Sequence, residues 1–405
     1  MAAEAAAEAD TATDVAEERP RPSRLRRFED RAYPLVGPLF VFLVTRVTQL
    51  VVLAWMTRPD STVWQRLLTW DSGWFIRVAS EGYPSGFTYD ANGTLVGNGL
   101  AFLPGYPMLV RAFSWTGLSY EAASLVVTVL ASFVAAAFVY LLTADIWGRR
   151  TGIAMVFLLG AQPMSLVLSM GYSESLFLAF AAGGLYAIRR ERWILGGFFA
   201  GLACLTRVVG VAVTVALLVA LVEYGVRQWR GLRPASLAVW WRGGVGLVLG
   251  SLALPLYWWW VDARVGAAGA WFTIQDAGWT SHFDFGRGTL AFVAGTLHDG
   301  DGWVAVSTAV LLVVTVGLGV SALFVRPNWW PFLVYGAVIL GMGLGTEGYF
   351  HSKLRILVPA LVVLVPVAVA FGRARLRVAV PVAGVLLGVS GWYGAYMVTV
   401  WPYAI

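Results

Sequence analysis

Residues 120–143, YEAASLVVTVLASFVAAAFVYLLT, are almost entirely apolar and long enough to cross a membrane as one helix. Similar apolar runs of about 18 residues or more recur along the chain. The chain of 405 residues is 59% hydrophobic and 13% charged, and a soluble protein of this size cannot bury so much apolar surface. The sequence therefore predicts an all-α polytopic membrane protein.

About eleven membrane-spanning helices are expected from the apolar runs. Their predicted ranges are 35–56, 120–143, 151–169, 174–188, 194–206, 208–224, 243–261, 303–325, 329–346, 354–371 and 378–400. Two further apolar segments, 101–117 and 289–297, are expected to lie in the membrane interface or to re-enter the membrane.

The distribution of basic residues predicts the orientation of these helices. Most of the 29 Lys and Arg residues lie in the N-terminal region or in alternate short loops, which the positive-inside rule places in the cytoplasm. The first twenty residues are acidic and Ala-rich and lack the features of a signal peptide. We therefore expect residues 1–32 to form a disordered cytoplasmic tail and residues 33–405 to form a transmembrane domain. The long polar loops then face outward, so the chemistry is predicted to be extracytoplasmic.

The first extracytoplasmic loop, 57–119, contains the stretch TWDSGWFIRVASEGYP at residues 69–84. Its apolar residues recur at helical spacing, which predicts a short interfacial helix that ends at the Gly-Tyr-Pro sequence. Asp71 stands at the N-cap position of that helix, directly after Trp70. Asp71 is either a helix cap or a carboxylate available for chemistry.

Three later stretches carry polar residues toward the same side of the membrane. Glu174 begins a predicted span, where a deeply placed carboxylate costs roughly 2.5–3.5 kcal/mol, and it is either functional or an ion-pair partner of Arg207. Gln275, Asp276, Trp279 and His282 lie in WFTIQDAGWTSHFDFGRG, residues 271–288. Their mixture of hydrogen-bonding groups and flat rings suits sugar recognition, although ordinary interfacial loops are also rich in aromatic residues.

The stretch TEGYFHSKLRILVP, residues 346–359, places three cations at the outer end of a span. His351, Lys353 and Arg355 are positioned to meet a lipid phosphate, or Lys353 and Arg355 are snorkelling side chains at the interface. Lys353 is the only lysine in the chain, which suggests that its ammonium group matters.

The sequence predicts no cofactor and no metal site. Cys204 is the only cysteine, so neither an intrachain disulfide nor a thiolate cluster is possible. Asp299-Gly300-Asp301 has the form of a DxD motif but is interpreted as a turn. The almost exclusive use of Arg suggests a GC-rich bacterial genome, such as that of an actinobacterium.

Several stretches, taken in chain order, resemble one enzyme family. They are the Arg46 region of the first span, WDSGWFIRVASEGY, AFLPGYPML, QPMSLVLSMGYSES, LTRVVGV and, more loosely, FHSKLRILVP. In these stretches the chain resembles the mannosyltransferase that adds the second mannose of glycosylphosphatidylinositol anchors (the PIG-V-like family) and its bacterial relatives. These enzymes belong to the GT-C membrane glycosyltransferases.

The resemblance implies a GT-C fold in the bacterial inner membrane and an outward-facing active site. The implied donor is polyprenyl-phosphate mannose, the acceptor is a glycolipid or glycan, and membrane lipid is a further partner; no nucleic acid is expected. The implied reaction inverts the anomeric carbon, with Asp71 as the general base. The substrate-binding candidates are Trp70, Arg77, Tyr172, Glu174, Arg207, Gln275, Asp276, Trp279, His351, Lys353 and Arg355.

Other functions stay open at this stage. Many spans with internal charges also suit a transporter or a flippase of a lipid-linked glycan, and a non-catalytic envelope subunit is a further alternative. A GT-C enzyme that uses another carrier-linked sugar, such as arabinose or glucose, would show the same features.

Overall fold

The computed structural model describes residues 24–405 of the chain, with side chains from residue 34 onward. The chain divides into two units, Met1–Gly37 and Pro38–Ile405, and all contacts discussed below lie within the second unit. Of the predicted tail 1–32, residues 1–23 lie outside the described part of the chain, and residues 24–32 form the start of helix α1.

The described residues form helices α1 to α17, several 3-10 turns and one antiparallel β-hairpin. The first half contains α1 (Arg24–Met56), α2 (Val63–Leu67), α3 (Asp71–Glu81), β1 (Thr88–Tyr89), β2 (Leu95–Val96), η1 (Gly99–Ala101), α4 (Gly105–Ser114), α5 (Tyr120–Trp147), α6 (Arg149–Ala161), η2 (Ser165–Ser169), α7 (Glu174–Arg189), α8 (Trp193–Thr206) and η3 (Val208–Gly210). The second half contains α9 (Val211–Trp229), α10 (Leu237–Val265), α11 (Ala270–Trp279), α12 (Arg287–Asp299), α13 (Trp303–Ser321), η4 (Ala322–Phe324), α14 (Trp330–Gly345), η5 (Phe350–Ser352), α15 (Lys353–Ile356), η6 (Leu361–Leu364), α16 (Val365–Arg373) and α17 (Leu376–Thr399).

The helical membrane architecture is confirmed, but the number of eleven spans is not. Among the described residues, six helices are long and apolar enough to cross a membrane, and a seventh span is possible if a bent pair of helices counts as one. The six are Pro34–Met56, Tyr120–Trp147, Val208–Trp229, Leu237–Val265, Trp303–Phe324 and Leu376–Thr399. The predicted span 354–371 belongs to the bent pair, whose halves meet at 77°.

The predicted span 151–169 is broken after α6, which ends at Ala161. Pro163 cannot donate a helical hydrogen bond, and Met164 has a left-handed backbone with φ of 63°. The buried Arg46 of α1 stabilises this break, because its guanidinium donates to the carbonyls of Gly160 and Ser165 at 2.6 Å each. The chain then continues through η2 to the start of α7, where several predicted site residues lie.

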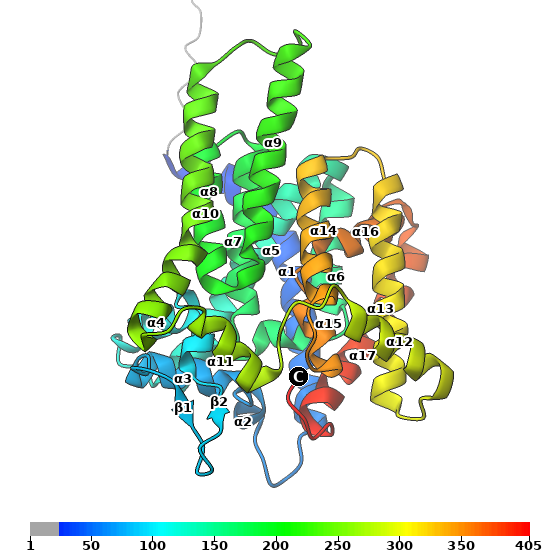
Figure 1. Ribbon diagram of the computed structural model, residues 1–405. Helices are drawn as coiled ribbons and strands as arrows, with labels where there is room; N and C mark the ends of the chain where they lie inside the picture. Colours follow the sequence, from blue (N-terminus) through cyan, green and yellow to red (C-terminus); the bar gives the residue numbers. More distant parts are fainter. Residues whose placement is uncertain (1–23) are drawn as a thin grey trace, which may run out of the picture. The chain divides into compact units, whose positions relative to one another are not determined.

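The first outer loop forms the short helices α2, α3 and α4 together with the β-hairpin. Figure 1 shows α3 and α4 near α11 at the lower end of α10. Phe75 of α3 packs edge-on against Tyr106 of α4 at 4.9 Å, and the Tyr106 hydroxyl donates to the Ser124 carbonyl of α5 at 2.9 Å. These contacts fix the start of α3 against the first turns of α5.

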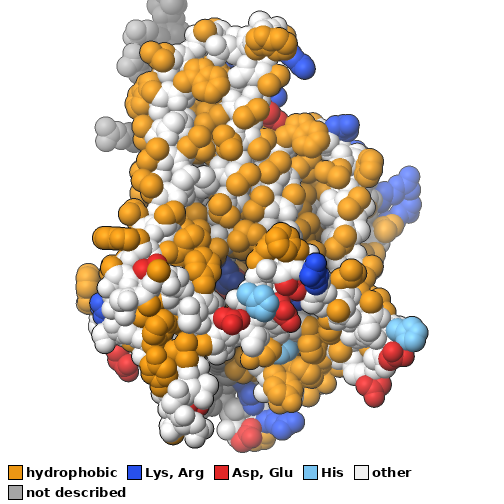
Figure 2. Space-filling view, in the orientation of Figure 1, with side chains coloured by type: hydrophobic (Ala, Val, Ile, Leu, Met, Phe, Trp, Pro, Cys, Tyr) orange, Lys and Arg blue, Asp and Glu red, His pale blue; other side chains and the backbone are white. Residues whose placement is uncertain are grey.

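Exposed apolar side chains cover the long helices, as expected for surfaces that face lipid. Figure 2 shows orange side chains over the upper part of the molecule, whereas acidic and histidine side chains gather in its lower half. The polar end is the one that carries α3 and α11.

Candidate active site

Asp71 begins helix α3 rather than capping it. The N-cap residue is Trp70, and no side chain forms a capping hydrogen bond there, so the simple helix-cap interpretation of Asp71 is wrong. Trp70 has a positive φ of 54°, which is strained for a bulky residue by about 1–3 kcal/mol and is characteristic of functional sites. This turn directs the Asp71 carboxylate toward Arg355, whose Nη1 lies 2.6 Å from Asp71 Oδ2.

Four charges of alternating sign extend inward from Asp71. Arg355 Nε lies 3.5 Å from Glu174 Oε1, and the same oxygen lies 2.8 Å from Nη1 of Arg207. The side chains of Glu174 and Arg355 are 1% and 10% exposed, and those of Asp71 and Arg207 are 20% and 19% exposed. We call these four residues the charge network. The network balances two carboxylates with two guanidinium groups, as burial of charge requires.

Glu174 is the most deeply buried member of the network. Among the described residues, no donor has hydrogen-bond geometry to either of its carboxylate oxygens, although Arg207 and Arg355 both lie within ion-pair distance. Arg207 also donates to the Ser173 hydroxyl at 3.2 Å. The ion pair of Glu174 with Arg207 expected from the sequence is therefore present, but Arg355 shares the same carboxylate.

Tyr172 supports the network from one side. The guanidinium carbon of Arg355 lies 5.0 Å from the centre of the Tyr172 ring, and the Tyr172 hydroxyl donates to the Thr69 carbonyl at 3.3 Å. Burial, followed by the nearby Asp71 carboxylate, raises the pKa of Tyr172 well above its usual value. Tyr172 therefore remains a neutral hydrogen-bond donor at physiological pH.

The loop before α7 can approach α3 because Gly171 has no side chain. A Cβ atom at this position would lie 2.5 Å from Ser124 Oγ and 3.1 Å from Ser72 Oγ. The Gly171 amide also donates to the Leu67 carbonyl at 2.9 Å, which ties this loop to the segment that precedes α3. The sequence Gly-Tyr-Ser-Glu thus places Tyr172 and Glu174 beside Asp71.

The polar groups of His351 and Lys353 are engaged outside the charge network. The Lys353 ammonium donates to the carbonyl of Thr346 at 2.7 Å and lies 3.5 Å from that of Gly343, at the C-terminal end of α14. A cation there is stabilised by the helix dipole. His351 Nδ1 lies 2.9 Å from the Ala404 carbonyl, and its ring stacks on Tyr349. Both residues hold structure around Arg355.

Of the residues predicted to recognise sugar, Gln275, Asp276 and Trp279 lie on α11, and His282 lies three residues after its end. Trp279 meets the rings of Trp74 and Phe102 edge-on at 6.0 and 5.3 Å, and the guanidinium carbon of Arg77 lies 5.3 Å from the centre of the Trp74 ring. We call Trp74, Phe102 and Trp279 the aromatic cluster. Gln275 donates to the Ala101 carbonyl at 2.9 Å, so its amide joins α11 to η1.

Asp276 takes part in a separate bridge that the sequence did not indicate. His282 lies between two carboxylates, with Nδ1 3.3 Å from Asp276 Oδ1 and Nε2 3.2 Å from Glu347 Oε2. The three side chains are about half exposed. Sequence reasoning also missed Trp74, because in the sequence it was only one of the apolar positions of a helix.

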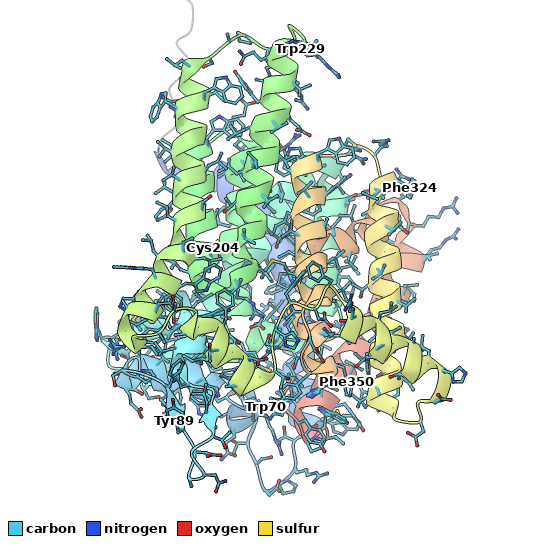
Figure 3. All side chains as sticks on the ribbon, in the orientation of Figure 1. Trp70, Tyr89, Cys204, Trp229, Phe324 and Phe350 are labelled. Carbon is cyan, nitrogen blue, oxygen red and sulfur yellow. The ribbon has the colours of Figure 1, made fainter. Side chains whose placement is uncertain are left out.

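An apolar groove of about 520 Å³ lies between α13 and α14. It is lined by Phe283, Phe285, Gly286, Val316, Gly319, Val320, Leu323, Leu333, Ala337, Leu340, Gly341, Leu344, Gly345 and Val362. Gly345 immediately precedes Thr346, the carbonyl partner of Lys353. Figure 3 shows Trp70 and Phe350 at the same end of the helices.

Comparisons with known proteins agree with this architecture. Residues 55–226 match the family model for mannosyltransferases (PIG-V), a range that includes Asp71, Glu174 and Arg207. The crystal structure of ArnT from Cupriavidus metallidurans bound to undecaprenyl phosphate aligns with a TM-score of 0.50 and 17% identity, over 85% of this chain and 62% of that one. This chain has the GT-C fold. Its resemblance to the PIG-V mannosyltransferases is confirmed over the matched residues.

Two further structures align less closely. The apo form of the same ArnT has a TM-score of 0.49 and 16% identity, over 84% of this chain and 60% of that one. The oligosaccharyltransferase of Archaeoglobus fulgidus in complex with Zn and sulfate has a TM-score of 0.44 and 12% identity, over 88% of this chain and 53% of that one. This chain therefore spans less than two thirds of ArnT. A comparison with curated proteins found no match.

Proposed function

We propose that this protein is a membrane mannosyltransferase that moves mannose from polyprenyl-phosphate mannose to a glycolipid or glycan acceptor. The reaction takes place on the extracytoplasmic side of a bacterial inner membrane and inverts the anomeric carbon. The observation that carries the proposal is the partly exposed Asp71 carboxylate, 2.6 Å from Arg355, within the region that matches the PIG-V family.

Asp71 acts as the general base in this proposal. A hydroxyl oxygen of the acceptor attacks the anomeric carbon of mannose while the bond from that carbon to the phosphate oxygen breaks. The hydroxyl proton passes to an Asp71 carboxylate oxygen, and polyprenyl phosphate leaves with the bonding electron pair. A positioned base contributes roughly 10²–10⁴-fold to the rate.

The two arginines of the charge network are the proposed partners of the donor phosphate. Arg355 and Arg207 present guanidinium groups that form strong hydrogen bonds to phosphate oxygens. Arg355 binds Asp71, so an incoming phosphate would compete with Asp71 for this guanidinium. Donor binding would thereby release the Asp71 carboxylate to accept a proton. Glu174 holds both arginines in place from the buried side.

The remaining candidates take supporting roles. The aromatic cluster offers flat apolar rings to a sugar face, and the exposed Asp276 offers a carboxylate to hydroxyl groups. The apolar groove between α13 and α14 suits the hydrocarbon tail of the carrier, because its outer end adjoins the segment that leads to Arg355. The segment 101–117 suits the tail less well, because its helix α4 packs against α3 and α5. His351 and Lys353 keep the α14–α15 connection in position.

The direct test compares Asp71→Asn with Glu81→Gln in purified protein reconstituted into liposomes. The substrates are radiolabelled polyprenyl-phosphate mannose and a lipid and glycan extract, and the readout is label transferred to acceptor. Glu81 lies at the exposed end of the same helix, so its substitution is the matched control. We expect Asp71→Asn to lower kcat by roughly 10²–10⁴-fold and Glu81→Gln to leave it within about twofold. Near-normal transfer by Asp71→Asn would remove Asp71 as the base.

The same reconstituted system separates an enzyme from a transporter or flippase. An enzyme forms a new glycosidic bond, so the label appears in a product that differs from the donor. Movement of intact donor across the bilayer, with no new product, would instead support transport.

A further inference from the structure

A second hollow, of about 460 Å³, lies where α5 meets α6. It is lined by Ile146, Trp147, Gly148, Arg149, Arg150, Thr151, Arg326, Pro327, Val369, Gly372 and Arg373. The 28 residues of α5 separate it from the candidate active site by roughly 40 Å, because α3 packs near the first turns of α5. Figure 3 shows Phe324, two residues before Arg326, at the end of the molecule opposite to Trp70.

The hollow concentrates positive charge without acidic side chains. Arg149, Arg150, Arg326 and Arg373 all line it, and its lining includes no Asp or Glu. Within residues 34–405, none of these four arginines forms an ion pair. Their exposed side chains are therefore available to an external anion. We call this hollow the arginine pocket.

Two basic residues close to the pocket are neutralised, in contrast to the four arginines that line it. The neighbouring Arg189 and Arg190 both pair with Asp145, at 2.9 and 3.1 Å. Asp145 lies only one residue before the pocket-lining Ile146, yet its carboxylate is directed to those two arginines.

Close packing brings the arginines together from three separate parts of the chain. A Cβ atom on Gly372 would lie 2.8 Å from Thr151 Oγ1, so glycine allows the end of α16 to reach the start of α6. The Trp147 indole donates to the Pro327 carbonyl at 3.1 Å and holds the loop that carries Arg326.

The backbone adds further donors for an anion. Helix α6 starts in the pocket after Gly148, which has no side chain to cap it. The first amide groups of a helix have no intrahelical partner, and the helix dipole favours negative charge at this end. Phosphate is the anion that such helix starts and guanidinium groups both bind well.

We propose that the arginine pocket binds a phosphate group, supplied by the headgroup of an anionic phospholipid. The positive-inside rule predicts that this end faces the cytoplasm, where basic pockets between helices bind such headgroups. The pocket is a separate site from the proposed active site, so this inference does not depend on the proposed transfer reaction. Soluble phosphate carries the same chemistry, and the experiment distinguishes the two sources.

The experiment measures thermal unfolding of the full chain in phosphatidylcholine micelles during titration with phosphatidylglycerol. The pocket variant is Arg149→Gln with Arg326→Gln, and the control variant is Arg230→Gln with Arg242→Gln. Both variants lose two positive charges on the same predicted face. Each arginine contributes about fivefold to the affinity for an anionic headgroup, so the pocket variant should bind on the order of 25-fold more weakly. The control should bind within about twofold of the wild type, because Arg230 and Arg242 do not line the pocket.

The outcomes separate the possible sources of the phosphate. Saturable stabilisation by phosphatidylglycerol that only the pocket variant loses supports the lipid site. The same pattern with inorganic phosphate, in phosphatidylcholine alone, supports a phosphate site filled from solution. Equal losses in both variants, or no saturable stabilisation by either anion, would overturn the proposal. A cooperative thermal transition in phosphatidylcholine alone shows that a variant is folded. If the Gln variant is not folded, Arg149→Lys with Arg326→Lys, which keeps both charges, replaces it in the titration.

Discussion

The ion pair between Asp71 and Arg355 allows the stability and the activity of the site to be separated. At an N–O distance of 2.6 Å, two unit charges attract by about 6 kcal/mol at an effective dielectric constant of 20. Desolvation offsets much of this attraction, but removal of one partner of a buried pair typically costs about 3–5 kcal/mol. Arg355→Gln should lower the free energy of unfolding by an amount in this range, because it leaves both Asp71 and Glu174 without this cation.

Replacement of both partners should lower the free energy of unfolding by less than the sum of the two single replacements. Asp71→Asn combined with Arg355→Gln removes both charges, so neither is left alone. We expect a coupling free energy of about 2 kcal/mol. The double variant should nevertheless remain inactive, because it has no base at position 71.

The assay is unfolding by SDS in mixed micelles, followed by circular dichroism for the wild type, both single variants and the double variant. The control cycle uses Asp145→Asn and Arg189→Gln, an ion pair with side chains 25% and 37% exposed. That pair should couple by less than about 1 kcal/mol. A coupling between Asp71 and Arg355 no larger than the control value would refute the argument that they stabilise each other.

Three further predictions concern the surroundings of the site. Gly341→Phe should fill part of the apolar groove, which Gly341 lines, and should lower the rate of mannose transfer from a long-chain donor at least about tenfold. Gly317→Phe is the control, because Gly317 also has open space around it but does not line the groove. Lys353→Gln removes the cation at the end of α14 and should lower the free energy of unfolding in SDS by about 1–2 kcal/mol. The KM for the donor should not change, and a raised KM would support phosphate binding by Lys353 instead. Backbone amides of Gly288 and Gly286 donate to Asp284 and lower the pKa of its carboxyl group. The carboxylate therefore stabilises the fold fully above the unfolded pKa of about 3.9, and this stabilisation is lost as the pH falls through the lower folded pKa. Thermal unfolding should therefore show wild type losing stability relative to Asp284→Asn below about pH 4, and parallel curves would contradict this.

Properties that depend on neighbouring residues alone were predictable from the sequence. Long apolar runs determine a helical membrane fold, because backbone groups in hydrocarbon must bond within their own segment. The pattern around Trp74 predicted the short helix after the first span, and Asp71 stood out as a charge at its start. The predicted span 151–169 failed where Pro163 breaks the helix, since the hydrophobicity of a segment does not report its backbone geometry.

Contacts between distant segments were decided only by the tertiary structure. Asp71 and Arg355 are 284 residues apart, and no local pattern indicates that α15 folds back onto the start of α3. Lys353 resembled a phosphate ligand in the sequence, yet packing brings its ammonium to the end of α14. The same holds for the arginine pocket, whose residues come from three loops and helix ends. Apolar composition and hydrophobic periodicity determine which segments enter the membrane, whereas the ion-pair partner of each charged side chain depends on how those segments pack.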